Sequence, residues 1–267
     1  MLTSTNEKLK RLRKLVHSAN FRSTERAFVI EGPNAVEAML RSDFNVEALF
    51  FSADLKQNHM LLLSQAYERG LAVFEVAPGT LESSLDLTNA QPLVAIAPIP
   101  DSKPLDLNGA SPLLILDELR DPGNAGTIIR SAHATGVHSI VFLPGSVDPY
   151  NPKVVRSSAG SLFFTKCHTN LDRSECFSRL RELNTPTYFA LASQDIQSDN
   201  THVYTELDLA SKVAMVIGNE AHGVSNETKA LCDGGITIPT LDSLESLNAS
   251  MAATVLLFES WRQRGLH

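Results

Sequence analysis

Short apolar runs and amphipathic runs alternate along the first hundred residues. The apolar runs have strand length and carry β-branched and aromatic residues, whereas the amphipathic runs repeat their apolar positions at helical spacing. The pattern therefore predicts a small α/β domain. The expected strands are 28–32, 46–52, 71–76 and 93–99, and the expected helices are 34–42 and 59–70.

A second alternation begins at residue 112, and its apolar runs are more continuous. Runs such as PLLILDEL (112–119) and KVAMVIGN (212–219) lack the regular polar positions of half-exposed strands. They favour a parallel sheet that helices cover on both faces, so an α/β fold is expected here too. The expected strands are 112–119, 138–144, 187–193, 212–219 and 235–240.

The segment PIPDSKPLDLNGASP (98–112) separates the two alternations. Its four prolines, with Asp, Ser, Asn and Gly among them, exclude a continued helix or a central strand. The resulting division is a basic helix or arm at 1–20, a first domain at 21–99, a linker at 100–111 and a second domain at 112–267.

Charge is distributed unevenly along this chain of 267 residues, whose net charge is −7. Residues 1–30 contain seven lysines and arginines but only two glutamates, so the remainder is strongly acidic. A basic N-terminal arm could contact phosphates. The alternative is a solvated amphipathic helix whose apolar stripe is Leu9, Leu12, Leu15 and Val16.

Cysteine usage and hydropathy favour a cytoplasmic protein. Cys167, Cys176 and Cys232 show neither a disulfide framework nor the spacing of a zinc site, so we expect reduced packing residues and no bound metal. No apolar run approaches the roughly 20 residues that cross a bilayer. The basic N-terminus is not followed by the apolar block of a signal peptide, and we expect no membrane association.

Three loops that follow predicted strands carry unusual polar residues, and ligands bind at the carboxyl ends of strands in open α/β sheets. In DPGNAGTIIRSAHATG (121–136), Asn124 can cap the helix that presents Arg130. In VIGNEAHGVS (216–225), two glycines lack side chains and would let the backbone beside Asn219 and Glu220 come close to a ligand. The first loop could instead be a strand-to-helix turn with an exposed arginine, and the Glu220 carboxylate of the second could cap the next helix.

The third loop leads into SLNASMAATVLLFE (246–259), where Ser246, Asn248 and Ser250 crowd a helix start. One of them, Ser246 or Asn248, is enough to cap the helix, so the others need another role. Short polar groups at a helix start suit a polar or carboxylate ligand. The sequence contains no dinucleotide fingerprint, no P-loop and no nucleophile elbow.

Taken together, NAGTIIRSA (124–132), IGNEAHGVS (217–225) and IPTLDSLESLNAS (238–250) resemble the three signature motifs of the SpoU (TrmH-like) RNA methyltransferases of the SPOUT superfamily. The resemblance spans residues 112–262, and FVIEGPNAVEAML (28–40) looks like the start of the small RNA substrate-binding domain found in many members. Ala221 is a departure, since many members have glycine after the motif glutamate; because one methyl group adds little bulk, we expect a change in the loop rather than a loss of binding.

The resemblance implies a trefoil knot in the C-terminal part of the parallel sheet, S-adenosylmethionine bound in that knot, and a homodimer that completes the site. The positions that would carry the reaction are Arg130, Asn124, Glu220, Ser246 and Asn248. The positions that would line the cofactor are Gly218, Ile238, Leu247, Asn219, Pro239 and Asn248.

The implied reaction is methylation of a ribose 2′-hydroxyl in RNA. Arg130 would act either as a base or, since arginine normally stays protonated, by orienting the hydroxyl and stabilising the developing alkoxide. The separate first domain favours large-subunit (23S) ribosomal RNA as the partner. Alternatives are a transfer RNA methyltransferase, an inactive RNA-binding member of the fold, and an unrelated nucleotide-binding α/β enzyme.

Overall fold

The computed structural model describes residues 1–55, 59–85, 92–101, 112–195, 200–241, 243–244 and 246–265. The chain forms two compact units, and the segment Tyr150–Phe163 belongs to the first unit together with Met1–Asp101. The expected linker at 100–111 lies outside the described residues from position 102 onward. The domain boundaries drawn from the sequence stay predictions.

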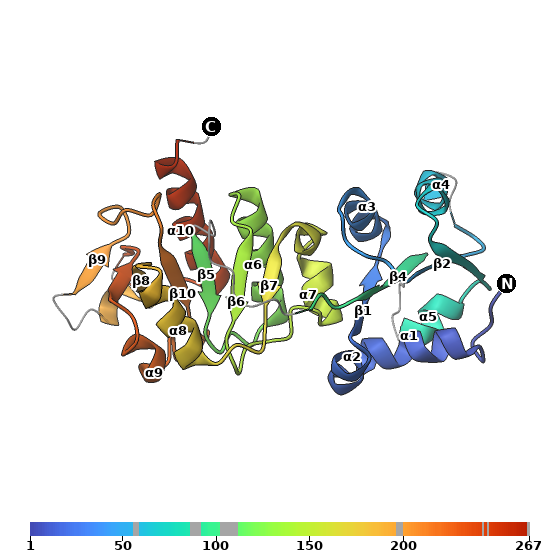
Figure 1. Ribbon diagram of the computed structural model, residues 1–267, viewed down its shortest axis with the longest axis horizontal. Helices are drawn as coiled ribbons and strands as arrows, with labels where there is room; N and C mark the ends of the chain where they lie inside the picture. The colour runs from blue at the N-terminus through green and yellow to red at the C-terminus, as the bar shows by residue number, and fades with distance from the viewer. Residues whose placement is uncertain are drawn as a thin grey trace. The chain divides into compact units, whose positions relative to one another are not determined.

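The first unit is built on a mixed four-stranded sheet in the order β1-β4-β2-β3. Strand β4 runs antiparallel to both β1 and β2, and β2 runs parallel to β3. Helices α1, α2 and α5 lie on one side of the sheet, and α3 and α4 lie on the other (Figure 1). The elements are α1 (Glu7–His17), α2 (Ala19–Glu25), β1 (Ala27–Glu31), α3 (Pro33–Arg41), β2 (Ala48–Ser52), α4 (Met60–Glu68), β3 (Ala72–Val76), α5 (Thr80–Leu85) and β4 (Leu93–Pro98).

Helix α1 is part of the core of the first unit. Leu9, Leu12 and Leu15 are buried against Phe50 and other sheet residues, so the amphipathic-helix interpretation of this basic segment is right. Several of its charges already have partners within the unit. Arg11, for example, is paired with Glu25 and Glu47.

Residues from later in the chain complete the first unit. Helix α7 (Pro152–Ser157) packs beside β1, and the Tyr150 ring contacts the Phe28 ring in a tilted arrangement with centroids 4.9 Å apart. Gly160 has a φ of +87°, and a Cβ at this position would lie 2.4 Å from the Cβ of Ala38. Only glycine allows this close approach.

The second unit contains a seven-stranded sheet in the order β7-β6-β5-β10-β8-β11-β9, in which every pairing is parallel. The predicted α/β architecture with a parallel sheet is confirmed. Strands β7 and β9, of three residues each, lie at the two edges and were not expected. The strands are β5 (Leu113–Leu116), β6 (Ser139–Phe142), β7 (Lys166–His168), β8 (Thr187–Leu191), β9 (Thr201–Val203), β10 (Ala214–Ile217) and β11 (Gly234–Thr237).

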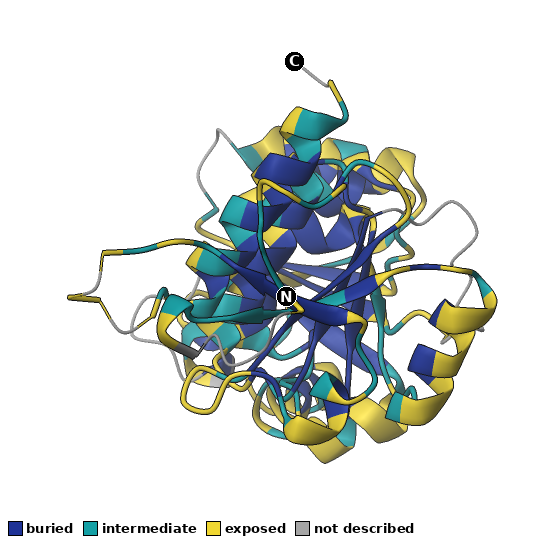
Figure 2. Ribbon diagram, turned by 90° about the vertical axis from the view of Figure 1, so that its left-hand side faces the viewer, coloured by how far each residue is buried: buried dark blue, intermediate teal, exposed yellow. Residues whose placement is uncertain are grey.

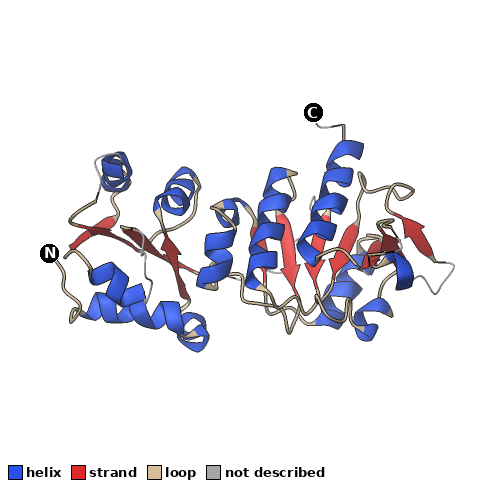
Figure 3. Ribbon diagram, turned by 180° about the vertical axis from the view of Figure 1, so that it is seen from behind, coloured by secondary structure: helices blue, strands red, loops and turns tan. Residues whose placement is uncertain are grey.

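Helices cover both faces of this sheet, as the continuous apolar strands require. Helices α6 (Pro122–Ala134) and α10 (Ala249–Gln263) pack together on one face, and α8 (Arg173–Glu182) and α9 (Asn226–Lys229) lie on the other (Figures 1 and 3). The strands are buried between these layers, whereas the helices expose their outer faces (Figure 2). The threading of the chain as a trefoil knot stays a prediction.

Leu12→Ala tests whether α1 is part of the core rather than an arm. Removing this fully buried side chain leaves a cavity, so we expect the free energy of unfolding in urea to fall by about 2–5 kcal/mol. Lys10→Ala, which removes an exposed charge from the same helix, is the control and should unfold like the parent. Parental stability of Leu12→Ala would contradict the placement of α1.

Candidate active site

Three segments that are far apart in sequence meet at the side chain of Asn124. Its amide nitrogen donates to Oε1 of Glu220 over 2.8 Å, and its Oδ1 accepts from Nδ2 of Asn248 over 3.1 Å. The three predicted motifs therefore contribute one residue each to a continuous chain of hydrogen bonds. The side-chain amide of Asn124 uses its donor and its acceptor for two different partners.

The start of α6 frees Asn124 for this role. The capping residue is Asp121, whose Oδ1 accepts from the backbone nitrogen of Asn124 over 2.7 Å, so the expectation that Asn124 caps the helix is wrong. The backbone nitrogen of Asp121 also donates to Glu220 Oε1 over 3.3 Å. Because Asp121 accepts the hydrogen bond from the first turn of the helix, the Asn124 side chain is available to contact the other two motifs.

The loop after β10 folds back on itself within a few residues. Asn219 and Gly223 exchange two backbone hydrogen bonds of 2.9 Å, and Gly223 has a φ of +67°. A Cβ on Gly218 would lie 2.2 Å from backbone atoms of Gly223 and Val224, so no larger residue fits without moving the loop. Close backbone contact therefore explains Gly218, and the left-handed φ explains Gly223.

Asn219 fixes this loop rather than projecting freely from it. Its Nδ2 donates to the backbone oxygen of Glu118 over 2.9 Å, and its Oδ1 accepts from the nitrogen of Ala221 over 2.8 Å. The φ of Ala221 is not positive, and its side chain is exposed. Alanine in place of the more common glycine is therefore compatible with this loop conformation.

The three polar residues at the start of α10 have different contacts. Asn248 caps the helix, because its Oδ1 accepts from the backbone nitrogens of Ser250 and Met251 over 2.9 and 3.4 Å. Ser250 is buried, and its hydroxyl donates to the same oxygen over 2.7 Å. Ser246 is exposed and lies beside the cavity described next.

A cavity of about 260 Å³ opens at the carboxyl ends of β8, β10 and β11. Of the predicted site residues, six line it and four do not. Those in its wall are Gly218, Asn219, Glu220, Ile238, Ser246 and Leu247. Those outside its wall are Asn124, Arg130, Pro239 and Asn248.

The cavity also has walls that the motifs did not indicate. Ala190–Ser193, at the carboxyl end of β8, forms one side, and His222 and Lys229 contribute polar groups. Lys229 lies with its ammonium 5.8 Å from the centroid of the Phe189 ring, and it makes no ion pair with another residue of the described ranges. Ala190–Ser193 and Lys229 lie outside the three motifs, so only the strand order could have identified them, whereas His222 lies within the second motif.

Arg130 is exposed on α6, six residues after Asn124 and therefore about 9 Å further along the helix axis. Its guanidinium has no hydrogen bond or ion pair within the part of the chain that the structure describes. The structure thus brings Asn124, Glu220 and Asn248 together, whereas Arg130 is exposed on α6 without a hydrogen bond to any of the three.

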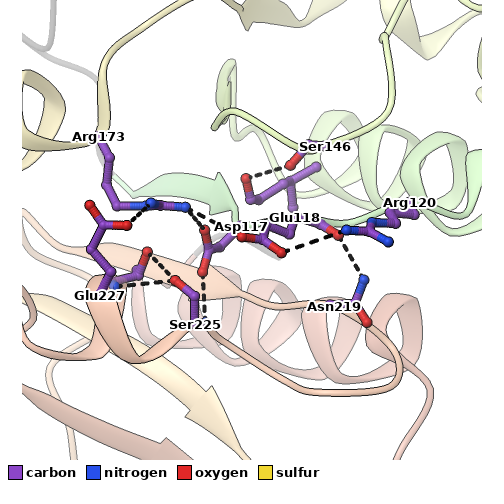
Figure 4. A network of polar contacts seen from close by, with 10 residues as sticks. Asp117, Glu118, Arg120, Ser146, Arg173, Asn219, Ser225 and Glu227 are labelled. Atoms are coloured by element: carbon purple, nitrogen blue, oxygen red, sulfur yellow. Dashed lines mark hydrogen bonds and ion pairs between the residues drawn. The ribbon is translucent and has the colours of Figure 1, made fainter.

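A group of buried charges beside the site was not anticipated. Asp117, directly after β5, is fully buried and paired with Arg173 at the start of α8 (Figure 4). Sequence periodicity gives no signal for such a pair, because its partners lie 56 residues apart.

The cysteines have no part in this site. All three are free, and burial raises the pKa of Cys176 and Cys232 to about 12, which keeps them as unreactive thiols. Among the described residues, no group of three or more His, Cys, Asp or Glu side chains could hold a metal ion.

Comparison with known proteins identifies the family. The model described as "SpoU rRNA Methylase family" matches residues 111–258, more than half of the chain, and an "MRM3-like substrate binding domain" matches residues 6–95. The chain belongs to the SpoU rRNA methylase family. The resemblance carried by the three motifs is therefore confirmed.

Full-length relatives and solved structures agree with this assignment. The chain is 31% identical over 275 residues to the 23S rRNA (uridine(2479)-2'-O)-methyltransferase of Streptomyces viridochromogenes, covering 98% of this chain and 92% of the relative. It is 32% identical over 248 residues to the 23S rRNA (guanosine-2'-O-)-methyltransferase RlmB of Bordetella pertussis, covering 88% and 97%. The crystal structure of the SpoU methyltransferase AviRb from Streptomyces viridochromogenes, in complex with AdoMet, has a TM-score of 0.81 at 27% identity and covers 98% and 100%.

Two substitutions of Asn248 separate its cap from its link to Asn124. Asn248→Ala removes both, so we expect the free energy of unfolding to fall by about 1 kcal/mol. Asn248→Asp keeps the cap oxygen but loses the Nδ2 donor, and its unfolding free energy should stay close to that of the parent. Urea denaturation measures both, and equal losses for the two variants would contradict this division of roles.

Proposed function

We propose that this protein transfers a methyl group from S-adenosylmethionine to a ribose 2′-hydroxyl of large-subunit ribosomal RNA. The observation that carries the proposal is the hydrogen-bonded set Asn124, Glu220 and Asn248, assembled from three motifs beside a cavity. Membership in the SpoU family and the 2'-O-methyltransferase activity named for the relatives support the reaction type.

The cavity has the chemistry that S-adenosylmethionine requires. Apolar contact to a flat base would come from Ile217, Ile236, Ile238 and Leu247. Gly218 has no side chain, so the backbone at this position can come close to a ligand. Lys229 provides a positive charge for the carboxylate of the methionine part. When bound, the cofactor supplies an electrophilic methyl group on a positively charged sulfur.

The residues around the cavity would position the reacting groups. Methyl transfer would join the 2′-oxygen to the methyl carbon as the bond between carbon and sulfur breaks, so the sulfonium would leave as a neutral thioether and the hydroxyl proton would pass to solvent water. Asn124, Glu220 and Asn248 hold the three loops, and Ser246 adds a hydroxyl for the cofactor or the ribose. Arg130 is the proposed catalytic residue, which orients the hydroxyl through the adjacent phosphate and stabilises the developing alkoxide.

A homodimer would bring Arg130 to a site that one chain leaves incomplete. Helix α10 exposes Met251 and Phe258, seven residues apart and thus on one face, at 63% and 44% of their surface. Large apolar side chains aligned on an exposed helix face are typical of an interface. Arg130 is exposed on α6, the helix that packs against α10.

The proposed RNA-binding part is the first unit, whose residues 6–95 match the substrate-binding domain model. No helix within the described residues is long and apolar enough to cross a membrane. We propose a cytoplasmic location, because that is where bacterial ribosomal RNA is available.

Arg130→Ala tests the proposed chemistry. We expect S-adenosylmethionine binding by calorimetry to remain, because Arg130 lies outside the cavity wall, while methyl transfer falls at least about 100-fold. Arg179→Ala, on α8 at the other face of the sheet, is the matched control. Ribose methylation should be mapped in large-subunit ribosomal RNA from cells with the parent gene, with each variant and without the gene.

Several outcomes would overturn the proposal. A parental rate for Arg130→Ala would remove Arg130 from catalysis. Absence of cofactor binding by the parent would support an inactive RNA-binding member of the fold. A methylated position found only in transfer RNA would change the substrate class.

A double substitution, Met251→Glu with Phe258→Glu, tests the homodimer. Charged groups on this face would have to be buried in the interface, so we expect the dimer to dissociate to monomers in sedimentation velocity experiments. Tyr67→Glu, on the equally exposed surface of α4, should leave the dimer intact. A monomeric parent, or a dimeric double variant, would rule out this interface.

A further inference from the structure

A fully buried carboxylate holds the far end of the loop that follows β10. Asp117 Oδ2 accepts from the backbone nitrogen of Ser225 over 2.8 Å, and its Oδ1 accepts from Nη2 of Arg173 over 3.1 Å (Figure 4). Ser225 is the capping residue of α9, so this bond fixes the point where the loop becomes helix.

The near end of the same loop is held to the same strand end. Asn219 donates to the backbone oxygen of Glu118, the residue after Asp117. Glu118 has a left-handed φ of +54°, which is unfavourable for a residue other than glycine and requires support from its surroundings. Both ends of the loop 219–225 are thus tied to two consecutive residues that follow β5.

Stability alone does not account for this arrangement. Ion pairs with a buried member lose much of their attraction to desolvation, and replacing them by apolar residues is often neutral or stabilising. Arg173 has only 13% of its side chain exposed, its Nε is buried without a hydrogen-bond partner, and it also pairs with Glu227. The pair instead fixes the positions of three segments relative to one another: the end of β5, the start of α8 and the loop after β10.

We propose that Asp117 and Arg173 are positioning residues for the cofactor: they hold the loop 219–225 in the conformation that forms the cavity wall. The inference rests on the proposed function, because it assigns S-adenosylmethionine to this cavity. Glu220, His222 and Gly223 lie between the two anchored ends and line the cavity. Releasing one end would therefore loosen the wall while leaving the sheet in place.

Asp117→Asn, Arg173→Met and the double variant test the inference. Calorimetry below the unfolding transition should show each single variant binding S-adenosylmethionine about tenfold more weakly, as expected for losing a hydrogen bond to a charged group. Because the two residues act as one unit, the double variant should bind no more weakly than the single ones. Amide exchange at 220–224 should accelerate in all three.

A second pair of variants tests the bond between Ser225 and Asp117 without touching the charges. Ser225 has a φ of −62°, which proline adopts, so Ser225→Pro deletes the donor to Asp117. Ser225→Ala removes the capping hydroxyl but keeps that donor. We expect weaker cofactor binding for Ser225→Pro than for Ser225→Ala, even if the Asp117 variants fold poorly.

Arg179→Met is the control, since it removes an exposed ion pair with Glu182 from the same helix as Arg173. It should bind the cofactor like the parent. Parental affinity and parental loop exchange in folded Asp117→Asn, Arg173→Met and Ser225→Pro would overturn the inference. If the parent binds no S-adenosylmethionine, the proposed function fails, whereas loop exchange still reports whether the anchors hold.

Discussion

The side-chain amide of Asn124 is the contact on which the site depends. It donates to Glu220 and accepts from Asn248, and so joins the loops after β5 and β10 to the start of α10. Among the described residues, no backbone hydrogen bond connects α6 to the segment that enters α10, so side chains determine their relative position at this end. A single neutral amide can do this because it offers a donor and an acceptor in fixed directions.

The parallel sheet makes that contact geometrically accessible. Strands β5 and β10 are neighbours, and all carboxyl ends of a parallel sheet lie at one edge, so their loops emerge side by side. Gly218 then lets the loop after β10 fold over itself, and Asp117 and Asn219 tie both of its ends to the end of β5. The cavity wall is a consequence of these anchors together with the sheet.

Much of the fold followed from hydrophobic periodicity, because continuous apolar strands require cover on both faces. Hydrophobic periodicity did not predict the edge strands β7 and β9, because three residues are too few to show a period. The packing of Tyr150–Phe163 within the first unit is also a tertiary effect, which depends on contacts such as Tyr150 with Phe28. In the candidate site, the sequence predicted Asn124, Glu220 and Asn248, whose side chains the structure brings together, but not which residue caps α6. Asp121 takes that role at α6, and the buried pair of Asp117 and Arg173 has no local signature.

A crystal structure of the protein with S-adenosylmethionine tests the central claim most directly. The account predicts the cofactor between the Gly218 loop and the segment containing Ile238 and Leu247, with its methyl group directed toward Asn124 and Glu220 and with the hydrogen bonds of Asn124 intact. A cofactor bound at another edge of the sheet, or a separated Asn124 and Asn248 in the bound state, would contradict it.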